Sequence, residues 1–234
     1  RQGDWVTIGA LTVSWLLALS LFVPTFFLGA PLPDQTRAVD WAVTADGSWR
    51  LGIFADGLTL GMLFVVTTVS LLVHIFSAGY MHGHPRYSRF FAYISFFTFA
   101  MLGLVGADNL LFLFICWELM GFCSYMLIGF YFENPTAYRA AIKAFLTTRV
   151  GDVGLLIGSA ALFAATGQLT FTGIQAAIVA GSVSGPLLLF AALCILSGAI
   201  GKSAQFPLHV WLPDAMEGPS PVSALIHAAT MVAA

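Results

Sequence analysis

The sequence predicts an all-α protein, a polytopic bundle of transmembrane helices that includes an interrupted helix. Hydrophobic residues make up 59% of the 234 residues and charged residues only 9%, whereas a soluble domain carries about a quarter charged residues. Gly and Phe are abundant, at 23 and 21 residues, and small residues let helix backbones approach one another in lipid. The apolar residues also form runs of the roughly 20 residues that a membrane span requires.

Six segments are long and apolar enough to cross a membrane. They cover residues 5–29, 57–79, 89–106, 109–131, 137–165 and 186–204. A polar loop, 31–55, follows the first of them, and a seventh helix begins near Pro219. Because the chain starts at Arg1 rather than Met and stops within an apolar run, we expect it to be a piece of a longer polypeptide.

Positive charges in the short loops predict the orientation, because cytoplasmic loops are enriched in Lys and Arg. One set of helix ends carries four arginines, Arg1, Arg86, Arg89 and Arg139. The opposite set carries two arginines diluted by four aspartates: Arg37, Arg50, Asp34, Asp40, Asp46 and Asp56. The first set is therefore predicted to be cytoplasmic, or to face the matrix or stroma of an organelle.

Segment 202–221, KSAQFPLHVWLPDAMEGPSP, contains four prolines and one glycine within a stretch otherwise suited to a membrane. Proline removes a backbone donor and clashes with the preceding turn. In lipid the freed carbonyls need partners, so such breaks occur where protein or water surrounds them. Broken helices of transporters usually line an ion site. Composition alone is equally compatible with an ordinary loop between helices.

Ionisable residues lie inside the apolar segments. They are Glu118, Arg149, Asp152, Lys202 and, two turns into the last helix, His227. A charge at the bilayer centre costs about 2.5–3.5 kcal/mol. We therefore expect these side chains to face the interior of the bundle and to meet one another.

An acid, a base and a histidine on inward faces are what a proton relay requires, and Glu118, Lys202 and His227 are the candidates. If the glutamate approaches and leaves the lysine, Lys202 alternately holds and releases a proton. His227 can pass the proton on, because histidine titrates near neutrality. Arg149 and Asp152 are three residues apart, share a helix face and are predicted to pair in support.

Each of these residues also has a purely structural interpretation. Arg149 and Asp152 can form a static ion pair, and Glu118 can be a carboxyl group kept neutral by burial. Lys202 can extend its ammonium to the surface, and His227 can pack as a neutral ring.

Neither a metal site nor a cofactor site is predicted in this chain. The three cysteines lie in apolar helices without a CxxC pair, and small buried hydrophobes are the ordinary role of such residues. His82 and His84 have no third ligand nearby. No Gly-rich nucleotide fingerprint follows a strand, since no strand pattern is found.

Four stretches resemble the largest antiporter-like membrane subunit of respiratory complex I, NADH:quinone oxidoreductase, known as chain L or chain 5. They are HIFSAGYMHGHPRYSRFFAYISFF at 74–97, LLFLFICWELMGFCSYMLIGFY at 110–131, KAFLTTRVGDVGLL at 143–156 and GKSAQFPLHVWLPDAMEGPSPVSALIHAATMV at 201–232. The family is related to the large subunit of multi-subunit Na+/H+ antiporters.

The resemblance implies a fold with two inverted five-helix repeats. Residues 1–87 would be N-terminal transmembrane helices and a polar loop. Residues 88–234 would be the first repeat, incomplete at its C-terminus, with the second repeat absent. The family's buried glutamate, its lysine and histidine, and its arginine and aspartate match five residues of this chain: Glu118, Lys202, His227, Arg149 and Asp152.

The same resemblance implies a function. The chain would be a subunit of a proton-translocating enzyme without a redox centre of its own, and NADH, FMN, iron–sulfur clusters and quinone would bind partner subunits. Its partners would be other antiporter-like subunits and the lipid bilayer, with no nucleic acid. It would lie in the cell inner membrane, or in a mitochondrial inner or thylakoid membrane.

Three other functions stay open at this point. The first is a subunit of a multi-subunit Na+/H+ antiporter. The second is a membrane subunit of a related hydrogenase or of an inorganic-carbon uptake complex. The third is a structural bundle whose charges form static pairs. Co-purification of flavin and iron–sulfur subunits would favour complex I over these alternatives.

Overall fold

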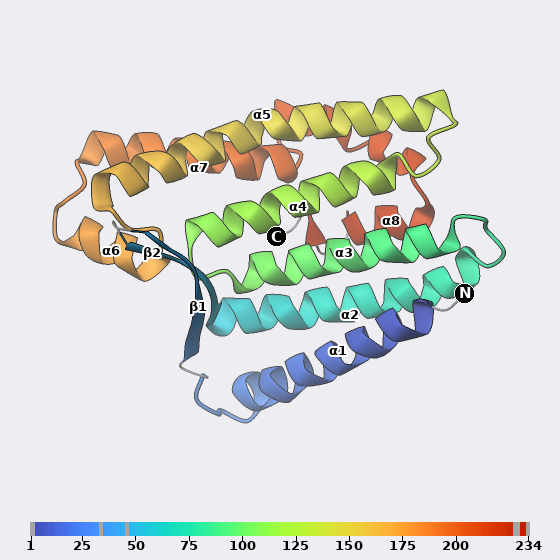
Figure 1. The fold of residues 1–234 in the computed structure, drawn as a ribbon, viewed down its shortest axis with the longest axis horizontal. Helices are drawn as coiled ribbons and strands as arrows, with labels where there is room; N and C mark the ends of the chain where they lie inside the picture. The colour runs from blue at the N-terminus through green and yellow to red at the C-terminus, as the bar shows by residue number, and fades with distance from the viewer. Residues whose placement is uncertain (1–2, 33–34, 45–46, 227–229, 233–234) are drawn as a thin grey trace.

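The computed structural model describes residues 3–32, 35–44, 47–226 and 230–232. In this part of the chain, six helices are long and apolar enough to cross a membrane. They are α1 (Asp4–Phe27), α2 (Gly57–Tyr80), α3 (Tyr87–Gly106), α4 (Leu110–Ile128), α5 (Pro135–Thr166) and α7 (Gly185–Lys202). The N-terminus and the α2–α3 and α4–α5 connections lie at one end of the bundle (Figure 1). The predicted helical bundle is confirmed.

Local sequence signals set several of the helix ends. The side chains of Asp56, Asn109 and Asn134 each accept a hydrogen bond from a backbone N–H in the first turn of α2, α4 and α5, respectively. Such N-caps satisfy donors that have no partner inside the helix. Helix α5 is followed by its C-cap residue Gly167, whose φ of 66° is left-handed and suits glycine.

The predicted polar loop 31–55 contains an antiparallel hairpin, so the expectation of no strands was wrong for this segment. Strands β1 (Gln35–Thr44) and β2 (Gly47–Ala55) pair with a register shift between Asp40 and Ala42. The hairpin docks on the bundle end, where the Asp108 N–H donates to the Gly52 carbonyl at 3.2 Å. The strands form because the backbone groups of two non-helical segments satisfy each other by pairing.

A second element arises in the uncharged loop 166–185. Helix α6 (Phe171–Val179) begins after Thr170, whose side chain accepts a hydrogen bond from the Gly173 N–H at 3.2 Å. A nine-residue helix is too short to span a bilayer. It covers the end of the bundle beside the hairpin (Figure 1).

Helices α5 and α7 approach each other through glycine. A Cβ atom added to Gly151 would lie 2.5 Å from the Ser197 carbonyl oxygen and 3.2 Å from Gly201 Cα. Gly198 likewise faces Leu155, and Gly158 faces the Ala191 carbonyl. Small residues allow this close backbone packing, which drives helix association in membranes in place of the hydrophobic effect.

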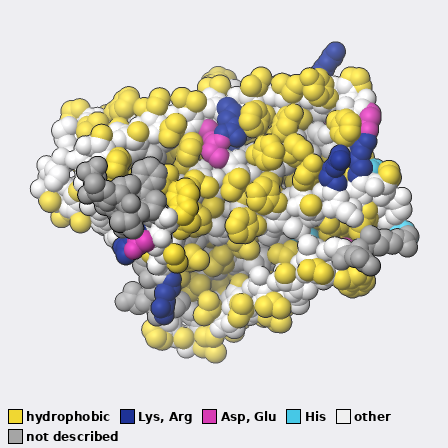
Figure 2. Space-filling view, viewed as in Figure 1, with side chains coloured by type: hydrophobic (Ala, Val, Ile, Leu, Met, Phe, Trp, Pro, Cys, Tyr) yellow, Lys and Arg dark blue, Asp and Glu magenta, His cyan; other side chains and the backbone are white. Residues whose placement is uncertain are grey.

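The main hydrophobic core joins α2, α3, α4 and α5 to the segment after α7. Its largest fully buried side chains include Phe90, Phe97 and Trp211. Many other apolar side chains are exposed on the outer faces of the helices. Figure 2 shows one such face, on which hydrophobic side chains predominate and charged ones are sparse. This exposure is what a lipid-facing surface requires.

The predicted interruption is present after α7. The helix ends at Lys202, and two 3-10 turns follow, η1 (Leu208–Trp211) and η2 (Asp214–Glu217), before α8 (Ser220–Leu225). The Trp211 indole donates to the Gly201 carbonyl at 3.0 Å, so a side chain satisfies a carbonyl near the end of the broken helix. The Lys143 ammonium holds Asp214 at 2.7 Å on the outer side.

Candidate functional site

Lys202, the last residue of α7, is buried, with 1% of its side chain exposed. Its Nζ lies 3.4 Å from Oδ2 of Asp152, which is 2% exposed. The glycine contact between α5 and α7 explains this meeting. Gly151 and Gly201 touch, and each is followed directly by one member of the pair. The close packing of two helices therefore supplies a buried ammonium with its counterion.

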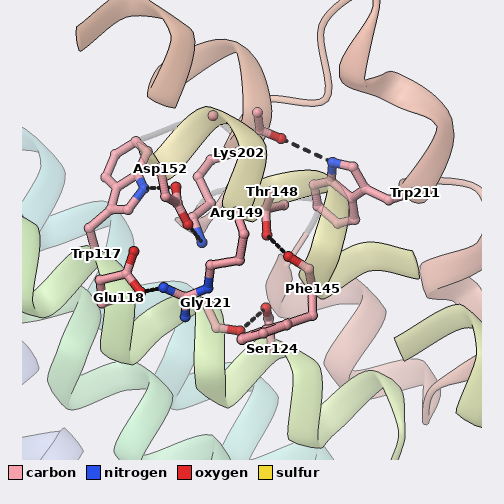
Figure 3. Close-up of polar contacts among 12 residues, drawn as sticks. Trp117, Glu118, Gly121, Ser124, Phe145, Thr148, Arg149, Asp152, Lys202 and Trp211 are labelled. Atoms are coloured by element: carbon pink, nitrogen blue, oxygen red, sulfur yellow. Dashed lines mark hydrogen bonds and ion pairs between the residues drawn. The ribbon is translucent and has the colours of Figure 1, made fainter. Parts of the chain in front are cut away.

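The second oxygen of Asp152 is held from a third helix. Trp117 of α4 donates its indole N–H to Asp152 Oδ1 at 2.5 Å. The Lys202 ammonium also lies 5.9 Å from the centre of the Trp117 ring, within the range of a cation–π interaction. Figure 3 shows the indole on one side of the Asp152 carboxylate and the lysine on the other. Trp117 therefore contacts both members of the pair.

Glu118 forms an ion pair with Arg149, which reaches from α5 to α4. The guanidinium also lies over the Phe145 ring, 4.5 Å from its centre. The two side chains are 22% and 29% exposed, so this pair is less enclosed than the lysine pair. Charges in the middle of these apolar helices are thus partnered, as expected from their cost in lipid.

The predicted pairing of Arg149 with Asp152 was wrong. Residues three apart share a helix face broadly but diverge by about 60° around the axis. Arg149 therefore points to Glu118 of α4 and Asp152 to Lys202 of α7, and an opposite charge on a neighbouring helix replaces the local partner. The structure also pairs Glu118 and Lys202 with different partners, where we had expected a direct contact to form and break.

Both basic groups converge on Gly121, one helical turn beyond Trp117. A Cβ atom added there would collide with Lys202 Nζ and lie 3.9 Å from Arg149 Nη2. The absence of a side chain therefore makes room for two cations beside the same stretch of α4 (Figure 3). Like charges so placed repel, which links the state of one ion pair to that of the other.

The buried pair is held by charge more than by hydrogen bonds. Over the described residues, neither Lys202 Nζ nor Asp152 Oδ2 has a hydrogen-bond partner. Charge-assisted N–H···O bonds are typically 2.7–2.9 Å long, and the 3.4 Å contact is longer. A buried ion pair with incomplete hydrogen bonding contributes little net stability. The 3.4 Å contact is therefore an ion pair rather than a short hydrogen bond.

Four of the five histidines fall into three cases. His227 lies outside the described residues. His74 is buried in α2, with ring nitrogens 2.7 Å from the Ser70 carbonyl and 3.3 Å from Ser95 Oγ, so it packs as a hydrogen-bonded ring. His82 and His84 lie in the α2–α3 turn at the end of the bundle. Among the residues that the structure describes, no group of three His, Cys, Asp or Glu could hold a metal ion.

Sequence reasoning missed Trp117 and Gly121. A tryptophan and a glycine in an apolar helix are ordinary residues of a lipid-facing or packed surface, and only their contacts single them out. The available signal was spacing, because Trp117 precedes Glu118 directly and Gly121 follows one turn later.

Two family models match separate parts of the chain. Residues 107–234 match the family described as NADH:quinone oxidoreductase/Mrp antiporter, transmembrane. This region is more than half of the chain. It contains the whole charged cluster, which consists of Glu118, Arg149, Asp152 and Lys202. The chain belongs to the NADH:quinone oxidoreductase/Mrp antiporter transmembrane family. Residues 41–91 match the N-terminal family of chain 5 of NADH–ubiquinone oxidoreductase, complex I.

Two similar relatives are subunits of NAD(P)H-quinone oxidoreductase. NAD(P)H-quinone oxidoreductase subunit 5 of the Nephroselmis olivacea chloroplast is 48% identical over 233 residues, covering 98% of this chain and 36% of the relative. NAD(P)H-quinone oxidoreductase chain 5 of Picosynechococcus sp. is 50% identical over 203 residues, covering 85% and 31%. The chain thus spans about a third of the length of these relatives.

Chains of two solved membrane complexes share the fold. A chain of the Mrp complex from Dietzia sp. superposes with a TM-score of 0.79 at 30% identity, covering 98% of this chain and 26% of that one. A chain of an archaeal membrane-bound sulfane sulfur reductase gives 0.80 at 19% identity, covering 97% and 45%. The chain is therefore a membrane-embedded, antiporter-like helical unit.

Proposed function

We propose that this chain is part of a proton-translocating membrane subunit of an NADH:quinone oxidoreductase complex. The observation that carries the proposal is the buried Asp152–Lys202 pair, coupled through Gly121 to the Glu118–Arg149 pair. Ionisable residues inside membrane spans are rare and mark ion pathways and proton relays. The names of the relatives, NAD(P)H-quinone oxidoreductase subunits, support the assignment.

The geometry suggests how Glu118 acts on Lys202 without touching it. While Glu118 neutralises Arg149, the lysine experiences mainly its own counterion, Asp152, and keeps its proton. When Glu118 is protonated or moves away, the positive charge of Arg149 acts on Lys202 and favours release of the proton. Unit charges 4 Å apart interact by about 4 kcal/mol at an effective dielectric constant of about 20. Glu118 would thus be a control charge, relayed through Arg149.

Redox chemistry and proton transfer would take place in different subunits of the complex. NADH, FMN, iron–sulfur clusters and quinone belong to partner subunits, while this chain holds and moves the proton at Lys202. His227, on the segment after α8, is the proposed next carrier. Residues 88–234 would form the first antiporter-like repeat and residues 1–87 its N-terminal addition. Other antiporter-like subunits would be neighbours in a bacterial inner membrane or an organelle membrane, including the thylakoid.

The test is proton uptake by the intact complex in sealed vesicles. Lys202→Ala and Glu118→Ala should assemble but lose most proton uptake per quinone reduced, because each removes a charge of the coupled set. Lys143→Ala is a matched control: it removes a lysine from an ion pair that is 44% exposed on both sides. Normal uptake in either cluster variant would exclude that residue from the relay.

A Na+/H+ antiporter subunit is the second candidate, favoured by the likeness to the Mrp complex at 30% identity. The same coupled charges would then exchange protons against sodium without electron transfer. Purification of the native assembly separates the two functions. Flavin and iron–sulfur subunits in the preparation favour the oxidoreductase, whereas sodium-dependent proton flux without them favours the antiporter.

A further inference from the structure

We propose that Trp117 is a positioning residue for proton transfer at Lys202. Its indole N–H donates a hydrogen bond to one oxygen of Asp152. The carboxylate therefore attracts the Lys202 ammonium without forming short hydrogen bonds to it through both oxygens. This inference rests on the proposed function, since it assigns a role within proton translocation. It concerns a residue that binds no proton itself.

The two carboxylate oxygens of Asp152 have different partners. Asp152 Oδ1 accepts the Trp117 N–H at 2.5 Å, whereas Oδ2 faces Lys202 Nζ at 3.4 Å without a hydrogen bond within the described chain. The exposed pair of Lys143 with Asp214 closes to 2.7 Å. The buried pair is therefore the looser one, although burial strengthens the attraction between charges.

The indole N–H limits how the Asp152 carboxylate can bind the ammonium. A carboxylate with both oxygens free can turn and accept two N–H bonds from an ammonium. A donor fixed on Oδ1 sets the rotation of the group and competes for its negative charge. Lys202 then keeps a counterion, but its ammonium is attracted less strongly to Asp152. Less interaction energy is therefore lost when the proton leaves. Trp117 thus holds the pair in a state from which transfer is possible.

Helix α4 provides the surface on which the Lys202 ammonium lies. The Trp117 ring lies on one side at 5.9 Å, and the bare Gly121 backbone lies one turn away, where any side chain would displace Nζ. The lysine therefore meets a ring face and a gap on α4 rather than a second acid. Phenylalanine at position 117 would keep an aromatic ring but lose the N–H donor. Trp117→Phe is therefore the informative substitution.

Trp117→Phe should be compared with Trp15→Phe in the intact complex in sealed vesicles. Trp15 also donates its indole N–H across a helix contact, to Thr68 Oγ1 at 2.9 Å between α1 and α2, but it lies outside the charged cluster. We expect the alkaline limb of the pH profile of proton uptake to move upward by about 1–2 pH units in Trp117→Phe, because the freed Asp152 closes on Lys202. The profile of Trp15→Phe should not move, and the KM for quinone should stay constant in both.

A spectroscopic readout tests the contact without relying on transport. The indole N–H band in ultraviolet resonance Raman spectra responds to hydrogen bonding, and wild type minus Trp117→Phe isolates the band of Trp117. It should report a strong hydrogen bond, and Asp152→Asn should weaken it, because an amide oxygen is neutral. If Trp117→Phe does not assemble, the spectrum of wild type minus Asp152→Asn still tests the contact, because it should show the shift of a single indole N–H band.

The outcomes separate the two proposals. A shifted pH profile with a strong, Asp152-dependent hydrogen bond supports the role of Trp117. An unshifted profile in a pumping complex, or an indole band that ignores Asp152, overturns the role and leaves the proposed function standing. A wild-type complex that moves no protons overturns both.

Discussion

The Lys202 ammonium lies 3.4 Å from the Asp152 carboxylate, and both side chains are almost completely buried between α5, α7 and α4. Neither of the facing atoms makes a hydrogen bond in the described part of the protein. The counterion of the lysine is therefore Asp152 rather than Glu118. This difference changes which substitution should affect stability and which should affect transport alone.

Asp152→Asn should both destabilise the protein and stop proton uptake. Removing one partner of a buried ion pair leaves an uncompensated charge, which costs about 3–5 kcal/mol. The double variant Asp152→Leu/Lys202→Met should recover most of that stability without recovering transport, since it replaces the pair by apolar groups. Thermal unfolding of the purified complex measures the first effect and vesicle assays the second.

The exposed pair of Lys143 and Asp214 provides the control for that experiment. Exposed ion pairs contribute about 0–1 kcal/mol, so Asp214→Asn should barely change the unfolding temperature. If Asp214→Asn lowered the unfolding temperature as much as Asp152→Asn does, the broken segment would depend on this exposed ion pair for its stability.

Substitutions of Glu118 should separate charge from shape. Glu118→Gln keeps the shape but leaves Arg149 uncompensated beside Lys202, and we expect proton uptake to fall at least about tenfold, equivalent to about 1.4 kcal/mol. Glu118→Asp keeps the charge on a shorter side chain and should retain partial activity. Unchanged uptake in the Gln variant would instead favour a carboxyl group that is neutral in the resting protein.

The glycine contact between α5 and α7 should be as sensitive as the charges. In Gly151→Ala the new methyl would lie 2.5 Å from the Ser197 carbonyl oxygen, so the helices must move apart. We expect destabilisation of about 1–3 kcal/mol and reduced transport, because Asp152 and Lys202 would separate. Gly61→Ala in α2, where nothing lies within 4 Å, should be neutral or stabilising by up to about 1 kcal/mol. Equal effects in both variants would disprove the importance of the contact.

The hairpin should depend on its anchor at the start of α4. Asn109 caps that helix by accepting from the Phe112 N–H at 2.8 Å, and its amide donates to the Arg50 carbonyl at 3.0 Å. Asn109→Ala loses both contacts and should destabilise this end of the bundle by about 1–2 kcal/mol. Limited proteolysis within 35–55 should speed up in the variant. Unaltered cleavage would show that the hairpin is held by other contacts.

The sequence by itself determined the membrane-spanning helices and the break after Lys202. Runs of apolar residues and a cluster of prolines are local signals, because lipid forces every backbone group to be satisfied within its own segment. The same cost of burying charge singled out Glu118, Arg149, Asp152 and Lys202 before any fold was known.

Only the tertiary structure decided which charge meets which. Spacing along α5 suggested that Arg149 and Asp152 pair, but the glycine packing of α5 on α7 brings Lys202 to Asp152, and α4 brings Glu118 to Arg149. The parts played by Trp117 and Gly121, and the pairing of β1 with β2, likewise depend on segments distant in the chain. The distance and direction of packing between helices decide which side chains on separate helices become partners. The spacing of residues within one helix carries no information about that packing.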